Sequence, residues 1–332
     1  MSVGSSAPKP VADAPPAATR GDSRSPRVVS LLPAGTDIVT ALGADGTLVG
    51  VSHECPLPGA IAGVPRVTES ALRAASVPGR AATAAAIDAS VAERSRAGEP
   101  LFHLREHEIA ALGPEVILTQ ALCDVCAVSE TDVRALARRL DRPPSVVTLS
   151  ASTLPGVFDD ILAVADALGR RGAGEELVRS LRQRMERIHE VLSAARAPRP
   201  RVAVIEWTEP TYAAGHWVPE MVHRAGGSDV LAVPGQHSRQ LLWEAVIEVA
   251  PDIVIIAPCG YTIERAAAEG EALARARPWL AGRIVWAVDA ESMVSRPGPG
   301  LIGGIETFAA IFNPGLFAAP PRSRAVRIGG GQ

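Results

Sequence analysis

Two stretches of this sequence, one in each half, follow the same plan. Residues 109–123 (IAALGPEVILTQALC) and 246–259 (VIEVAPDIVIIAPC) each contain a short helical segment, a proline, an acidic residue, an apolar run and a cysteine. Helical segments that alternate with short apolar runs are typical of parallel α/β sheets. The repeat therefore predicts an α/β chain of two similar lobes, each built on a parallel sheet.

The flanking sequence extends this pattern. Strand-like apolar runs at 27–32, 47–52, 115–120 and 145–150 alternate with helical patterns at 33–43 and 129–140. Residues 68–100 interrupt the order, and a helix is expected there at 83–97. RVAVIEW (201–207) resembles the first apolar run and begins the second lobe. Strand–helix–strand order favours parallel pairing.

Between the lobes lies a long helical region. Residues 156–169 are amphipathic, and residues 175–196 place apolar side chains on one stripe opposite arginine and glutamate. We expect a long inter-lobe helix that makes the joint stiff and keeps lobe closure small. The predicted parts are a disordered tail (1–26), an N-terminal α/β lobe (27–152), an inter-lobe helical linker (153–197), a C-terminal α/β lobe (198–315) and a flexible tail (316–332).

Composition excludes several classes of protein. The net charge of −3 comes without a basic patch, which argues against a nucleic-acid partner. The longest apolar runs have strand length, so the chain is not expected to span a membrane. No apolar leader follows a basic start, which predicts a cytoplasmic protein. A true start upstream would instead place it in the periplasm or outside the cell.

The loops expected after the strands have an unusual composition. In open parallel α/β sheets, ligands bind beyond the carboxyl ends of the strands, so two facing lobes would form a cleft. Four of the seven Trp and Tyr residues lie in two of these loops, namely Trp207, Tyr212, Trp217 and Tyr261. Aromatic walls with a few polar groups suit a bulky, flat organic ligand.

The four cysteines and one histidine also fall in these loops. Their thiolate and imidazole groups form a candidate zinc or iron site, which consists of Cys55, Cys123, Cys126, Cys259 and His53. The alternatives are that each cysteine is a small buried apolar residue, or that the CxxC is redox-active. Four cysteines in 332 residues do not indicate a disulfide scaffold.

Catalytic signatures are missing from the sequence. It contains no GxSxG, no phosphate-binding P-loop and no HExxH, which favours a binding protein over an enzyme. His53 and His216 are candidate metal ligands, general bases or hydrogen-bonding cleft residues. Arg296, in the glycine- and proline-rich SRPGPG, is a candidate for anion binding or for a structural ion pair.

Several motifs together resemble a known family. The sequence resembles the iron-siderophore and vitamin B12 class of periplasmic substrate-binding proteins. The motifs that carry the resemblance are RVVSLLPAGTDIVTALG, LVGVSHECPLP, ALGPEVILTQ (with Glu115 where Asp is usual), RVAVIEW, GHWVPEMVHRAGGSDVL and PDIVIIAPCG. The resemblance covers about residues 27–314. It implies a class III binding-protein fold and an ABC-transporter permease as partner. Five shorter motifs look like those of the branch of this family that is labelled cobalamin-binding protein. They are HECP, LCDVCAVS, GHWVPE, APCG and SRPGP.

The resemblance implies a non-enzymatic protein that holds a corrinoid or related metal chelate in the cleft. A siderophore or haem receptor is an alternative, as is a cytoplasmic protein with a Cys/His metal site. Two departures, the missing export signal and the four cysteines, suggest a relative that stores, hands on or senses its ligand. The expected ligand-binding residues are Ser30, Pro33, Thr36, His53, Glu54, Glu206, Trp207, Tyr212, His216, Trp217, Tyr261 and Arg296.

Overall fold

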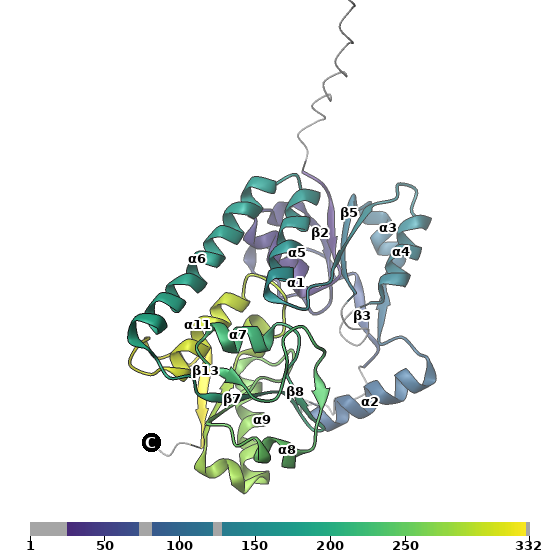
Figure 1. The fold of residues 1–332 in the computed structure, drawn as a ribbon. Coiled ribbons are helices and arrows are strands. Elements are labelled where there is room, and N and C mark those ends of the chain that lie inside the picture. The colour runs from purple at the N-terminus through teal and green to yellow at the C-terminus, as the bar shows by residue number, and fades with distance from the viewer. Residues whose placement is uncertain (1–24, 73–81, 122–127, 330–332) are drawn as a thin grey trace, which may run out of the picture.

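The computed structural model describes residues 25–72, 82–121 and 128–329. The expected tail at 1–26 therefore lies almost wholly outside the described residues, and so do Cys123 and Cys126. The described residues form two lobes, one above the other in Figure 1, with long helices along one side. None of the described helices is both long enough and apolar enough to cross a membrane.

The first lobe is built on a four-stranded parallel sheet with the order β2-β1-β5-β6. Its strands are β1 (Val28–Ser30), β2 (Leu48–Val51), β5 (Val116–Gln120) and β6 (Ser145–Leu149). Its helices are α1 (Pro33–Ala41), α2 (Ala84–Ala97), α3 (Glu106–Leu112) and α4 (Glu130–Arg139), with 3₁₀ turns η1 (Asp45–Thr47) and η2 (Gly59–Ile61). Two short strands, β3 (Thr68–Ser70) and β4 (Phe102–Leu104), pair antiparallel with each other.

Alternation along the strands explains how helices cover both faces of this sheet. Val28 and Leu118 belong to the core shared with α1, whereas Val29 and Ile117 pack with α3 and α4. Successive strand side chains point to opposite faces. A sheet covered on both faces therefore needs continuous apolar strands, which is the pattern that the sequence shows.

The second lobe contains a larger mixed sheet with the order β10-β8-β7-β11-β12-β13, and β9 pairs with β7. The strands are β7 (Arg201–Thr208), β8 (Thr211–Ala213), β9 (Ser228–Asp229), β10 (Arg239–Gln240), β11 (Ile253–Ile256), β12 (Ile284–Val288) and β13 (Ala325–Ile328). The helices are α7 (Val218–Arg224), α8 (Trp243–Glu248), α9 (Ile263–Ala276), α10 (Ala290–Met293) and α11 (Leu301–Phe312), with the 3₁₀ helix η4 (Pro278–Gly282).

The topology confirms the two-lobe fold expected from the repeat. In the first lobe α3 precedes β5, which lies between β1 and β6. In the second lobe α8 precedes β11, which lies between β7 and β12 in the same parallel sense. The two repeated sequence stretches thus form equivalent central strands.

The joint between the lobes consists of two helices and not of a single one. α5 (Leu154–Ala167) and α6 (Arg171–Ala195) pack side by side, and α6 runs along both lobes in Figure 1. Ile38, Ile161, Met221 and Phe308, which come from both lobes and the joint, belong to one continuous apolar core. A shared core resists separation of the lobes, because opening it would expose apolar surface to water.

Two features of the chain differ from the expected division. The predicted flexible tail at 316–332 contains β13, which pairs antiparallel with β12 and thereby covers the edge of the parallel strands. The insertion that carries α2 also reaches the second lobe, because the Arg265 guanidinium donates a hydrogen bond at 2.9 Å to the carbonyl of Ala82, two residues before α2. A single sequence shows neither contact, because both partners are remote along the chain.

Candidate ligand-binding cleft between the lobes

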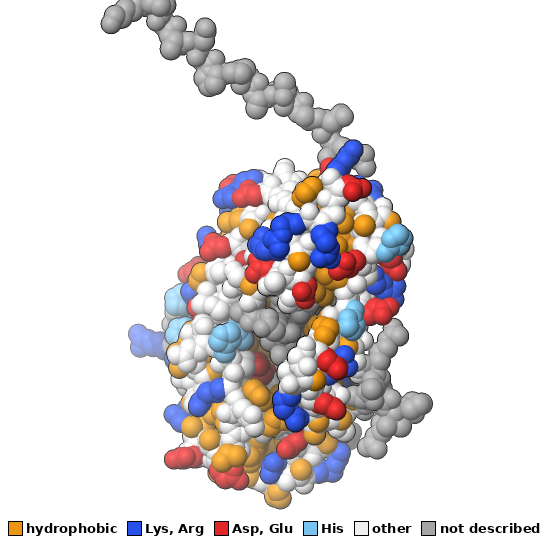
Figure 2. Space-filling model, turned by 90° about the vertical axis from the view of Figure 1, so that its right-hand side faces the viewer, with side chains coloured by type: hydrophobic (Ala, Val, Ile, Leu, Met, Phe, Trp, Pro, Cys, Tyr) orange, Lys and Arg blue, Asp and Glu red, His pale blue; other side chains and the backbone are white. Residues whose placement is uncertain are grey.

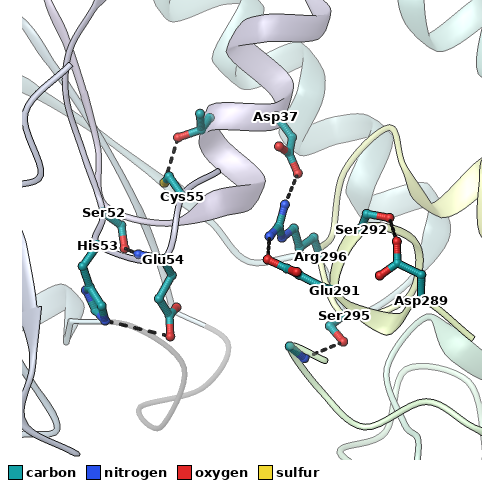
Figure 3. A network of polar contacts seen from close by, with 12 residues as sticks. Asp37, Ser52, His53, Glu54, Cys55, Asp289, Glu291, Ser292, Ser295 and Arg296 are labelled. Atoms are coloured by element: carbon teal, nitrogen blue, oxygen red, sulfur yellow. Dashed lines mark hydrogen bonds and ion pairs between the residues drawn. The ribbon is translucent and has the colours of Figure 1, made fainter. Parts of the chain in front are cut away.

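A pocket of about 530 Å³ lies between the lobes. Asp37 and residues 56–58 line it from the first lobe, while Ser292, Arg296 and Gly300 line it from the second. These segments follow β1, β2 and β12, as expected for a site beyond the carboxyl ends of parallel strands. Figure 3 shows Arg296 and Glu291 facing Asp37 across this boundary.

Arg296 joins the two lobes through ion pairs. Its Nη1 lies 3.4 Å from Asp37 Oδ2 on α1, and its Nη2 lies 2.6 Å from Glu291 Oε1 on α10. Only 12% of the Arg296 side chain is exposed. Of the two roles considered for Arg296, the ion pair is the one that the structure shows.

Packing around Arg296 fixes this arrangement. A Cβ at Gly298 would lie 3.8 Å from the Ala34 carbonyl oxygen, so the loop passes close to α1. Burial raises the pKa of Asp37, and the neighbouring Arg296 opposes this by lowering it. Burial alone would favour the neutral form of the Asp37 carboxyl, and the positive charge of the guanidinium offsets part of this effect.

The loop after β2 presents His53 and Glu54 near the same boundary (Figure 3). Thr68 Oγ1 accepts a hydrogen bond from the His53 backbone N–H at 2.9 Å and lies 2.7 Å from its Nδ1. The His53 ring packs against Phe102 with centroids 5.5 Å apart. These contacts fix the orientation of the imidazole, whereas the Glu54 side chain is about half exposed.

Cys55, in the same loop, is part of the core. It is 1% exposed, and its Sγ lies 3.1 Å from Thr36 Oγ1. Burial raises the pKa of the Cys55 thiol to about 11, and the Thr36 hydroxyl partly opposes this. Cys259 in the second lobe is exposed. Among the residues that the structure describes, no group of three or more His, Cys, Asp or Glu side chains is placed to hold a metal ion.

This difference between the two cysteines gives a direct test. Iodoacetamide added to native protein at pH 8 is expected to alkylate Cys259 and to leave Cys55 unmodified until denaturant is added. At that pH about one Cys55 thiol in a thousand would be ionised, and burial blocks access. Peptide mass spectrometry reads each cysteine separately, and equal native rates at the two sites would contradict the structure.

Three of the four candidate aromatic residues lie together. Trp207 and Tyr212 are cross-strand partners in the β7–β8 hairpin, and the Tyr261 ring meets the Trp207 ring edge-on at 5.6 Å. Tyr261 is itself buried, with the Arg265 guanidinium 3.7 Å from its ring centre. Glu206, beside Trp207, is half-buried, and its carbonyl accepts a hydrogen bond from the Cys259 N–H at 3.0 Å.

The fourth aromatic residue, Trp217, does not join this cluster. Its side chain is buried, and its Nε1 donates a hydrogen bond to the Val294 carbonyl at 2.8 Å. It therefore supports the segment that carries Arg296 and does not line an open cleft. His216, its neighbour, is half-buried and lies beside His237, with a ring nitrogen of each 3.2 Å apart.

Ser30, Pro33 and Thr36 shape the turn into α1. The buried Ser30 hydroxyl donates to the Leu32 carbonyl at 2.9 Å, Pro33 is the first residue of α1, and the buried Thr36 contacts Cys55. Sequence reasoning missed Asp37 and Glu291. Neither contact had a signal in the sequence, because Glu291 and Arg296 are five residues apart, which is not a helical pair spacing, and Asp37 lies 259 residues from its partner.

Charged side chains of both signs are mixed on one face of the molecule. On the face shown in Figure 2, acidic and basic side chains are interspersed over both lobes, and the described residues form no broad basic surface there.

Comparison with known structures finds the same fold. A periplasmic haem-binding protein from Pseudomonas aeruginosa matches with a TM-score of 0.65 at 21% identity, over 92% of this chain and 98% of its own. The periplasmic vitamin B12-binding protein of Vibrio cholerae matches with a TM-score of 0.56 at 20% identity, over 87% and 96%. Identities this low establish the fold alone.

An ABC-transporter substrate-binding protein from Listeria monocytogenes also matches, with a TM-score of 0.61 at 14% identity, over 87% of this chain and 99% of its own. No curated protein matches the chain. A protein-family match described as "periplasmic binding protein" covers residues 28–279. The chain therefore belongs to the periplasmic binding protein family, whose members are binding proteins and not enzymes.

Proposed function

We propose that this protein binds a corrinoid or a related planar metal chelate between its lobes, as the substrate-binding component of an ABC importer. The observation that carries the proposal is the inter-lobe pocket of about 530 Å³, which both lobes line. This volume lies within the range of about 300–1,000 Å³ typical of small-molecule sites. A site shared by two lobes can enclose a ligand larger than either lobe could hold alone.

The aromatic cluster is connected to this pocket. The Gly260 N–H donates to Ser295 Oγ at 3.2 Å, and the Glu291 N–H donates to the Tyr261 carbonyl at 3.0 Å. The loop that carries Tyr261 is thereby attached to the segment that carries Arg296. The half-buried rings of Trp207 and Tyr212, beside charged and polar groups, suit a macrocycle with polar substituents.

Trp207 offers the ligand a hydrogen-bond donor. Its indole Nε1 is buried and has no hydrogen-bond partner among the described residues. A buried donor without a partner is unfavourable by about 1–3 kcal/mol. A carbonyl group of the ligand that accepts this hydrogen bond would remove the penalty, and corrinoids carry several such amide groups.

Titration with aquocobalamin, followed by calorimetry and the visible spectrum, tests the proposal. We expect saturable binding at tens of micromolar or below, weakened at least tenfold by Trp207→Ala. Trp207→Phe separates loss of the hydrogen bond from loss of the aromatic face. His53→Ala and His216→Asn test whether either imidazole binds cobalt, because losing a cobalt ligand changes the spectrum more than the heat.

Trp279→Ala is the matched control, because Trp279 belongs to the same core cluster as Trp207 but packs against Trp243, whereas Trp207 packs against Tyr261. Its affinity should equal that of the wild type. Absence of both heat and spectral change with cobalamin would contradict the corrinoid assignment. Similar proteins are described as binding haem, so haem is titrated in parallel. Binding of haem without cobalamin would support the haem-receptor alternative.

The Cys/His metal hypothesis has less support. Cys55 lies in the core with a thiol pKa of about 11, and thiolates are the form that binds zinc or iron. Metal analysis of protein purified without oxygen tests this alternative. Stoichiometric zinc or iron that is lost in a Cys123→Ser, Cys126→Ser double variant would support it.

A further inference from the structure

Two histidines from separate segments of the second lobe lie in direct contact. His216 precedes α7, and His237 lies in the loop before β10. The distance between His216 Nε2 and His237 Nδ1 is 3.2 Å. Their ring centres are 5.1 Å apart, and the ring planes are nearly perpendicular at 89°.

The backbone holds these two segments together on both sides of His216. The His216 N–H donates to the Gln236 carbonyl at 2.6 Å, and the Gly235 N–H donates to the His216 carbonyl at 2.9 Å. The Gly215 N–H donates to Ser238 Oγ at 3.0 Å. A Cβ at Gly215 would lie 2.4 Å from the Ser238 nitrogen, so only glycine permits this approach.

The conformation of His216 is also unusual. Its φ of 55° lies in the left-handed region, which is unfavourable for residues other than glycine. Such strain persists where the surrounding structure enforces it, and it occurs often at functional sites. Here it directs the His216 ring towards His237 while the backbone stays paired with the neighbouring loop.

We propose that His216 and His237 together bind one divalent transition-metal ion. With metal–nitrogen bonds of about 2.1 Å, two nitrogens at this separation subtend an angle of about 100° at the metal, between the octahedral and tetrahedral values. The ion would take the place of the proton that the two nitrogens share. The imidazole that donates this proton in the hydrogen bond would change tautomer and hold the proton on its other ring nitrogen, so both imidazoles stay neutral.

Neutral imidazole is the form that binds metals. Burial lowers the pKa of His216, and the proximity of His237 lowers it further, so the ligand form predominates at neutral pH. Among the described residues, no third His, Cys, Asp or Glu completes a metal-binding group. Water would fill the remaining positions, which makes the site weak and exchangeable. Imidazole ligands suit nickel, copper and zinc.

This site requires neither the inter-lobe pocket nor a corrinoid, and His237→Ala tests it without changing His216, which the cobalamin titration also examines. The test titrates tag-free protein with nickel chloride by calorimetry in a chelator-free buffer. We expect binding whose affinity falls at least tenfold in His237→Ala and in His216→Asn. Asparagine is chosen at position 216 because it tolerates the left-handed region. His107→Ala, an exposed histidine on α3, is the matched control.

Every cysteine is retained in these variants, so nickel binding by thiols would persist in all of them. A loss confined to the two His variants supports the pair, and His237 is exposed enough for its alanine variant to fold normally. Circular dichroism checks that folding. Equal nickel affinity in the wild type and His237→Ala would overturn the proposal, whatever the outcome with cobalamin.

Discussion

Replacing Trp217 with alanine is expected to lower the free energy of unfolding by about 3–5 kcal/mol. The side chain is 5% exposed, so the truncation leaves a cavity in the core that both lobes share. The Val294 carbonyl also loses the indole N–H that it accepts at 2.8 Å. Urea denaturation followed by circular dichroism measures the change.

Two further variants separate the causes. Trp217→Phe keeps most of the apolar volume, so we expect it to lose at most about half of the stability that Trp217→Ala loses. Leu242→Ala, at a side chain that is 75% exposed, should change stability by less than about 0.5 kcal/mol. Near-normal stability of Trp217→Ala would show that this ring is not part of the core.

Replacing Arg296 with methionine is expected to lower the free energy of unfolding by about 2–3 kcal/mol at neutral pH. Removing one member of a buried ion pair leaves its partners desolvated without compensation, which typically costs about 3–5 kcal/mol. We expect less here because Asp37 and Glu291 are each 32% exposed. Methionine keeps much of the side-chain volume, so the loss reflects charge more than packing.

This loss should depend on pH. Arg296 lowers the pKa of Asp37 against the raising effect of burial, so removing it raises that pKa further. A carboxyl whose pKa is higher in the folded state favours folding at pH values below its unfolded-state pKa. This stabilisation is lost as the pH rises through its folded-state pKa. The difference between variant and wild type should therefore shrink as pH falls towards about 4.

A double variant and a surface control complete this test. Adding Asp37→Asn to Arg296→Met should restore part of the stability, because the uncompensated carboxylate is removed. Arg134→Met breaks a pair with Glu130 in which the arginine is 46% exposed, against 12% for Arg296, and should change stability by less than about 1 kcal/mol. If Arg296→Met were no more destabilising than Arg134→Met at pH 7, the inter-lobe pair would have no stabilising role.

The loop after β7 shows how far sequence reasoning about the site extends. Trp207 and Trp217 lie in one loop sequence and were expected to face the same ligand. The β7–β8 hairpin places Trp207 beside Tyr212 and near Tyr261, whereas Trp217 precedes α7 and packs against Val294. Composition predicts that aromatic residues gather in a loop, but the direction of each ring depends on the backbone that carries it.

The sequence by itself determined the two-lobe α/β fold. Continuous apolar strands, helical spacing and the repeat around 109–123 and 246–259 are local patterns, and each reflects burial of a strand on both faces of its sheet. It also placed His53 and Arg296 in loops beyond strand ends, because parallel strands end at a common edge.

The tertiary structure alone decided which side chains meet. Asp37 and Arg296 are 259 residues apart, and His216 and His237 are 21 apart in separate segments. The first pair forms because the shared core brings α1 against the Arg296 loop. The second forms because Gly215 lets two backbone segments approach closely. Such contacts depend on how distant elements pack, and the spacing of residues along the chain does not predict that packing.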